Sequence, residues 1–114
     1  MNYDLEERCE KFGEAVILFG VKIKRDDAVK SLISQLIRSA TSIGANYMEA
    51  NQASSKKDFA NKIRLSQKEA NETKHWLRMI KTAIPNTEEE SKKLWKEAHE
   101  LTLIFAKISR SSKE

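Results

Sequence analysis

The sequence predicts an all-α protein, an up-down-up-down antiparallel four-helix bundle. One observation is composition: 33% of the 114 residues are charged, with three glycines and one proline, which favours helices over sheet turns. The other is periodicity, since apolar residues recur in alternating steps of three and four along four segments joined by short breaks. We expect a single domain over residues 1–114, with helices over roughly 3–24, 27–53, 55–84 and 88–110.

Each predicted helix carries one apolar seam that should face the core. The first seam is Leu5, Cys9, Phe12, Val16, Phe19 and Ile23. The second is Leu32, Leu36, Ala40, Ile43, Tyr47 and Ala50. The third is Phe59, Ile63, Ser66, Ala70, Thr73, Leu77, Ile80 and Ile84. The fourth is Leu94, Ala98, Leu101, Phe105 and Ile108. The same rhythm also describes helices that pack against another chain, so it does not count subunits.

The breaks between the seams carry residues that cap helix N-termini. Their side-chain oxygens accept from backbone N–H groups that the first turn leaves free. The candidates are Asp26 or Asp27, then Ser54 or Ser55 followed by Asp58, and finally Thr87 followed by Glu90 as a capping box after the single proline.

The sequence also indicates the cellular compartment of the protein. The longest charge-free apolar run, residues 15–21, is far shorter than the roughly 20 residues that span a bilayer. The acidic start "MNYDLEER" is unlike a signal peptide, and Cys9 is the single cysteine, so no intrachain disulfide can form. We therefore expect a cytoplasmic protein with no membrane partner.

The third predicted helix separates into distinct faces. Opposite its core seam runs a row without acids, called here the basic stripe: Lys57, Asn61, Arg64, Lys68, Asn71, His75 and Arg78. Residues 55–83 contain eight Lys or Arg against three Asp or Glu, whereas residues 1–21 contain two against five. Such polarisation suits a partner with phosphates or an acidic surface. We predict nucleic-acid binding by this stripe; the alternative is a merely solvated helix face.

Apolar residues beyond the seams predict self-association. They are Leu65, Trp76 and Met79 on a flank of the third helix, and Ile17, Leu18 and Val21 on the first. A bundle with this many apolar residues off its seams is expected to bury them against copies of itself, although core packing is the alternative.

The motif "ETKH", Glu72 to His75, has the Glu-x-x-His spacing of di-metal centres in helical bundles. Such a centre needs a second copy, but the other histidine, His99, follows Lys96 rather than an acid at that spacing. Cys9 lies on the apolar seam, where a thiol is an unreactive small hydrophobe. We predict no catalytic residue, no metal and no cofactor, and hence no enzyme.

Small and polar residues over 38–51 predict close packing of the second helix on the third. Antiparallel pairing about a turn near residue 54 brings Arg38 within reach of Glu69 or Glu72. Glu49 is expected either to accept from Lys62 or to cap the start of the third helix. We expect a buried polar network that sets the register of the two helices. Its members are Arg38, Ser42, Asn46, Glu49, Glu69 and Glu72.

The stretches "QLIRSATSIGANYMEA", "SSKKDF" and "KEANETKHWLRMI" resemble the bacterial four-helix-bundle family of 23S ribosomal RNA intervening-sequence proteins. The residues on the family's pattern are Arg38, Ser39, Ser42, Ile43, Asn46, Glu49, Ser55, Asp58 and Phe59. The chain departs from many relatives at Ala50, where they have glycine, and at Ala53, where they have arginine.

The resemblance implies a left-handed bundle, a homopentamer around a central channel, and neither enzyme activity nor a cofactor. Some relatives are encoded inside insertions of ribosomal RNA genes, and a related retroelement accessory protein is a basic barrel that engages nucleic acid. The resulting prediction is a non-enzymatic oligomeric bundle that binds RNA or a ribonucleoprotein through the basic stripe. The alternative is a protein–protein scaffold or accessory subunit without direct nucleic-acid binding.

Overall fold

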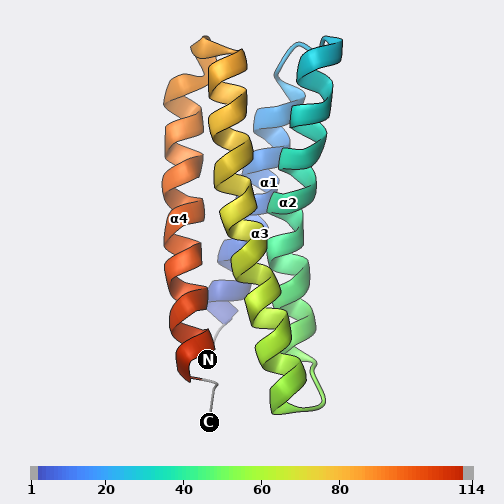
Figure 1. The fold of residues 1–114 in the computed structure, drawn as a ribbon, viewed down its shortest axis with the longest axis vertical. Coiled ribbons are helices and arrows are strands. Elements are labelled where there is room, and N and C mark those ends of the chain that lie inside the picture. The colour runs from blue at the N-terminus through green and yellow to red at the C-terminus, as the bar shows by residue number, and fades with distance from the viewer. Residues whose placement is uncertain (1–2, 112–114) are drawn as a thin grey trace.

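The structure, a computed structural model, describes residues 3–111 as four long helices with no strand among them (Figure 1). The helices are α1 Tyr3–Val21, α2 Asp27–Asn51, α3 Lys56–Ala83 and α4 Glu88–Ser111, and a 3₁₀ turn, η1 Pro85–Thr87, leads into α4. The predicted all-α four-helix bundle is confirmed. The largest difference in bounds is in α1, which ends at Val21 rather than at residue 24.

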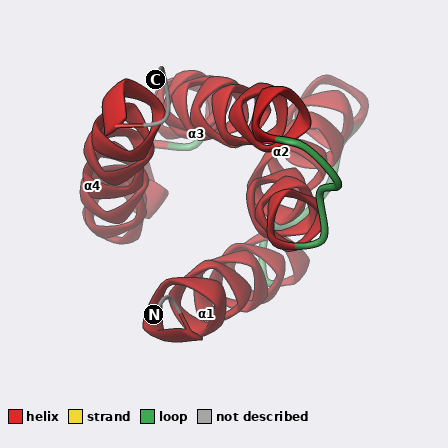
Figure 2. Ribbon diagram, turned by 90° about the horizontal axis from the view of Figure 1, so that it is seen from below, coloured by secondary structure: helices red, strands yellow, loops and turns green. Residues whose placement is uncertain are grey.

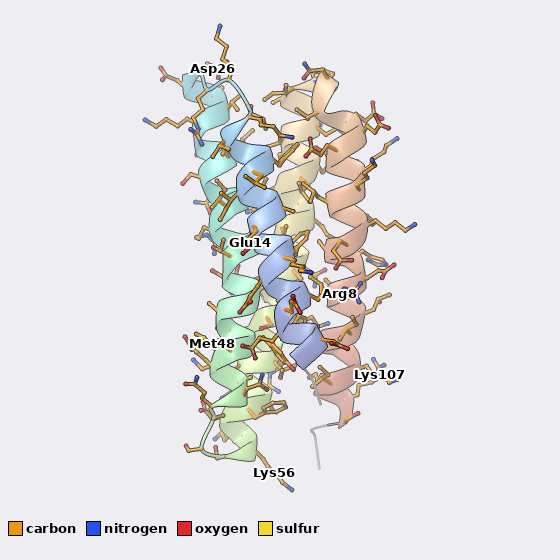
Figure 3. All side chains as sticks on the ribbon, turned by 180° about the vertical axis from the view of Figure 1, so that it is seen from behind. Arg8, Glu14, Asp26, Met48, Lys56 and Lys107 are labelled. Carbon is orange, nitrogen blue, oxygen red and sulfur yellow. The ribbon has the colours of Figure 1, made fainter. Side chains whose placement is uncertain are left out.

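Successive helices run antiparallel and occupy the corners of a rod measuring 46 × 20 × 20 Å (Figures 1 and 2). With α1 in front and its N-terminus at the bottom, α2 lies to its left and α4 to its right (Figure 3). This is the left-handed arrangement that the family resemblance implies.

The core is formed by the predicted seams. All their members are buried, apart from Ile23, Leu32, Phe59, Ile84 and Ile108, which are partly buried and pack against the core. Tyr47 of α2 and Phe105 of α4 bring their rings to 5.7 Å across the bundle diagonal. The periodicity of the sequence therefore identified the inward faces of all four helices.

The contact between α2 and α3 is close because small residues lie on both sides of it. Ala40 and Ala70 are fully buried, and so are three hydroxyl side chains. The Thr73 hydroxyl lies 2.9 Å from Ser39 Oγ, and Ser66 Oγ donates to the Ile43 carbonyl at 3.0 Å. These bonds satisfy polar groups that would otherwise be costly to bury.

The last pair, α1 and α4, packs least closely (Figure 2). Long charged side chains bridge it: Arg8 donates to both carboxylate oxygens of Glu97 at 2.6 and 2.8 Å and to Glu100 at 2.9 Å. Figure 3 shows Arg8 between the two helices. Hydrogen bonding to Glu97 outweighs partial burial and raises the pKa of Arg8 above its ordinary value.

Two of the three predicted helix caps are present. Asp26 accepts from the Val29 N–H at 2.9 Å, and Ser55 accepts from the Asp58 N–H at 3.0 Å. The predicted capping box at Thr87 was wrong. Pro85 starts η1, so Thr87 is already within a helical turn, and its hydroxyl donates backward to the Ile84 carbonyl at 2.7 Å.

Two glycines of α1 make a testable comparison of packing. At Gly13 an added Cβ would lie 3.7 Å from Thr41 Cγ2, an ordinary contact. Gly13→Ala should therefore raise the free energy of unfolding by about 0.5–1 kcal/mol, because alanine loses less conformational entropy in a helix. Urea denaturation measures this change.

Gly20→Ala is the matched variant. Its Cβ would lie 3.1 Å from Ile37 Cδ1 and 3.2 Å from Ile33 Cγ2, so overpacking opposes the same helix-propensity gain. We expect Gly20→Ala to be less stable than Gly13→Ala. Equal stabilisation by the two variants would contradict the close approach of α1 to α2.

Candidate nucleic-acid interface

All seven residues of the basic stripe are exposed on the outward face of α3. They face solvent because the opposite side of the helix carries the core seam from Ile63 to Ile80. From Lys57 to Arg78 the stripe extends about 30 Å at the helical rise of about 1.5 Å per residue. It thus runs along most of α3, as predicted from the sequence.

Within residues 3–111, no acidic side chain pairs with the cations of the stripe. In the described chain, Lys57, Arg64, Lys68 and Arg78 form no ion pair, whereas Arg8 is paired between helices. Arg64 instead donates to the Asn61 side-chain oxygen within the stripe. These positive charges therefore remain available to an external anion.

The middle of the stripe surrounds a shallow hollow. It is lined by Arg64, Gln67, Lys68, Asn71, Glu72 and His75. Its one acid, Glu72, already accepts from Arg38 of α2 at 2.5 Å. The remaining lining groups are cations, amides and an imidazole, which together can donate several hydrogen bonds to one anionic group.

The ion pairs expected between α2 and α3 are present. Arg38 donates to Glu69 at 3.1 Å as well as to Glu72, and Lys62 donates to Glu49 at 2.7 Å. Burial acts to lower the pKa of Arg38, but the hydrogen bonds from its guanidinium to Glu72 and Glu69 raise it overall.

The predicted network differs from the structure in two respects. It is not buried, since the Arg38 side chain is 44% exposed. Nor do Ser42 and Asn46 reach α3: Ser42 donates to the Arg38 carbonyl at 2.7 Å and Asn46 to the Ser42 carbonyl at 2.9 Å. A carbonyl one turn back in the same helix is the nearest acceptor for such short side chains. Ser39, Ser66 and Thr73 make the buried polar contacts instead.

The apolar residues predicted to mediate self-association fall into two groups. Ile17, Leu18 and Val21 are exposed on α1, Leu18 to 62%, and Leu65 is exposed on α3. Trp76 and Met79 are partly buried, and Trp76 packs against the core of its own bundle. The outer face of α1 is therefore the larger unpartnered apolar surface of the two.

The two ends of the "ETKH" motif belong to different surfaces. Glu72 binds Arg38, while His75 lies on the exposed stripe with its ring edge against Trp76 at 4.7 Å. Residues 3–111 contain no group of three or more potential metal ligands. Cys9 is 1% exposed, and burial raises the pKa of its thiol from 9.0 to about 12.

A groove between α3 and α4 was not anticipated from the sequence. Its lining is Leu77, Arg78 and Lys81 from α3, and Ser91, Lys92, Trp95 and Lys96 from α4. Trp95 is 40% exposed although it follows the core residue Leu94. The interleaving of an aromatic with lysines in "KKLWK" was the available signal.

None of the helices within residues 3–111 has the length and apolarity needed to cross a bilayer.

These features define a left-handed all-α bundle with a cationic outer face on its third helix. The chain belongs to the 23S rRNA-intervening sequence protein family, whose model matches residues 2–110. It is also similar to the crystal structure of a protein of unknown function from the S23 ribosomal protein family of Bacteroides thetaiotaomicron. The two share 30% identity with a TM-score of 0.82, over 91% of this chain and 96% of that chain. No curated protein matches the chain.

The burial of Cys9 predicts an inert thiol in the native protein. At pH 8 a thiol with a pKa of about 12 is almost entirely protonated, and protonated thiols react slowly with aromatic disulfide reagents. We expect native protein to resist labelling by such a reagent and denatured protein to react fully. As a control, Ser34→Cys in a Cys9→Ala background places a thiol at an exposed site, which should label at once. Fast labelling of native Cys9 would contradict its placement in the core.

Proposed function

We propose that this protein is a non-enzymatic, self-associating bundle that binds RNA through the basic stripe. The observation that carries the proposal is the row of exposed, unpaired cations along one face of α3. Elsewhere in the bundle, cations such as Arg8 and Arg38 form ion pairs between helices. The stripe therefore provides positive charge that the fold itself does not use.

The chemistry of the stripe suits phosphate groups. Lysine, arginine, asparagine and protonated histidine all donate hydrogen bonds, and phosphate oxygens accept them. The only aromatic ring of the stripe is the imidazole of His75, which already lies against Trp76, so the contacts of the stripe would mainly position a nucleic-acid backbone rather than read a sequence. The family is named for intervening sequences of 23S ribosomal RNA, and the similar Bacteroides protein is assigned to a ribosomal protein family, which agrees with this partner.

Charge reversal on the stripe tests the proposal. Replacing Lys57, Arg64, Lys68 and Arg78 with Glu takes the formal net charge from +4 to −4, because each replacement changes it by −2. Since all four are exposed, the bundle should keep its helicity. We expect loss of binding to structured RNA in a filter-retention assay.

The control variant has the same formal net charge as the stripe variant, but its four replacements lie outside the stripe. Lys24, Arg25, Lys30 and Lys107 are also exposed, and Lys107 projects from α4 (Figure 3). Their replacement with Glu should leave most of the RNA affinity, because the stripe remains intact. Equal losses in the two variants would contradict a specific role for α3.

Salt dependence separates RNA from an acidic protein partner, the alternative occupant of this surface. For RNA, the logarithm of affinity should fall linearly with the logarithm of salt concentration, by about 0.7–0.9 for each phosphate neutralised. Four phosphate contacts correspond to a slope of about −3 to −4. Retention of a protein partner with no RNA retention would favour a scaffold function instead.

We also propose that the outer face of α1 joins copies of the chain, in the pentamer that the family resemblance implies. Ile17, Leu18 and Val21 form an exposed apolar row on one helix. Burial of such a row against a second copy would gain about 25 cal/mol for each Å² removed from water. In Figure 2, α1 lies diagonally opposite α3, so the face that each copy contributes through α1 is separate from the basic stripe.

The double variant Leu18→Lys and Val21→Lys should dissociate the oligomer, because burial of two ammonium groups is unfavourable. Native mass spectrometry or light scattering measures the change. The matched control is Leu103→Lys with Met48→Lys, which alters two other exposed apolar residues on α4 and α2. Dissociation by the control pair alone would place the contact elsewhere.

A further inference from the structure

The groove between α3 and α4 has a volume of about 390 Å³, within the range of about 300–1,000 Å³ typical of small-ligand sites. Leu77 and Ser91, both buried, lie among its lining residues, together with the exposed part of Trp95. Arg78 belongs to both this groove and the basic stripe, so the two surfaces are continuous.

The indole of Trp95 is held in place by its neighbours. His99, one turn along α4, stacks on it with ring centroids 5.2 Å apart and planes 13° from parallel. Lys74 of α3 places its ammonium 3.1 Å from His99 Nδ1 and 5.2 Å from the Trp95 ring centroid. A ring supported in this way loses little freedom when a second planar group stacks on its exposed part.

The rim of the groove is cationic on both sides. Arg78 and Lys81 extend from α3, and Lys92 and Lys96 from α4. Only Lys92 has an ion-pair partner among the described residues, Glu88 at 3.0 Å.

The acids of the two helices that form interhelical ion pairs lie on the sides away from the groove. On α4, Glu97 and Glu100 bind Arg8 of α1. On α3, Glu69 and Glu72 bind Arg38 of α2. The groove is therefore the place where the uncompensated charge of both helices meets an exposed aromatic ring.

We infer that this groove binds a single-stranded RNA segment, with one base stacked on Trp95 and the adjoining phosphates on Arg78, Lys81 and Lys96. A nucleotide is the ligand that combines a planar aromatic group with anionic oxygens, and base–aromatic stacking beside a cationic groove is the general mode of single-strand binding. An acidic peptide would use the cations but not the indole. The inference rests on the proposed RNA-binding function and adds a site for an unpaired strand.

Fluorescence tests the stacking directly. The chain has two tryptophans, so in a Trp76→Phe background the emission comes from Trp95 alone. The probe is single-stranded oligouridine of about ten nucleotides, close to the site size of one strand-binding module. We expect it to quench Trp95, whereas an abasic oligomer of the same length should bind more weakly and leave the emission unchanged.

Substitution of Trp95 measures how much stacking contributes to the affinity. Trp95→Ala should lower the affinity for oligouridine about 5- to 100-fold, the range that corresponds to one stacked base, and Trp95→Phe should restore most of it. Lys81→Gln with Lys96→Gln, outside the basic stripe, should weaken binding of the abasic and normal oligomers by similar factors. Circular dichroism confirms that each variant remains helical.

The outcomes separate this site from the stripe. If structured RNA binds and depends on Lys57, Arg64 and Lys68 while Trp95 is neither quenched nor required, the groove proposal is overturned and the proposed function stands. If no RNA binds at all, the groove proposal and the proposed RNA-binding function both fail. If AMP binds as tightly as oligouridine, the ligand of the groove is a free nucleotide and not a strand. A change of oligomer mass in Trp95→Ala would make the groove a contact between copies. Either of the last two results overturns the proposal.

Discussion

The close contact of α2 with α3 is the constraint on which the rest of the structure depends. Ala40 and Ala70 allow the backbones to approach, and the Ser39–Thr73 and Ser66–Ile43 hydrogen bonds satisfy the hydroxyls buried between them. These contacts lie on the same buried face of α3 as the apolar seam from Ile63 to Ile80, whose burial sets the rotation of the helix about its axis, and they help to fix its register. With this face of α3 turned inward, the opposite row of Lys, Arg and Asn has to point to solvent.

The rotation of α3 also separates charged side chains that form ion pairs from those that face solvent unpaired. The acids on the α2 side of α3 meet Arg38, and the acids on the α1 side of α4 meet Arg8, so these carboxylates are used in holding helices together. Cations of the outer face of α3 and of the α3–α4 groove stay mostly unpaired. A formal net charge of only +4 therefore coexists with one strongly positive side. The proposed function depends on where the charges lie more than on their sum.

Sequence reasoning predicted the features that helical periodicity determines: the four helices, their seams, the exposed stripe and the pairing of Arg38 with Glu69 and Glu72. It failed where the outcome depends on a local choice of hydrogen-bond partner, as for Ser42, Asn46 and Thr87, which all bond to a carbonyl one turn back. The groove at Trp95 was missed for another reason. It requires two helices side by side with known rotations, and a seam in a single helix indicates only which face is buried.

The remaining corner of the bundle is occupied by α1, the helix that has the least contact with the other three. It approaches α2 closely at Gly20, and ion pairs from the long, partly solvent-accessible side chain of Arg8 join it to α4. Its outer apolar row is exposed on the corner diagonal to α3 (Figure 2). If copies join through α1, each adds its own basic stripe and groove to the assembly. Several weak phosphate contacts on one assembly act together on a long strand, because binding of the first raises the effective concentration of the next. Self-association would then strengthen the proposed RNA binding, although each chain carries only a modest charge.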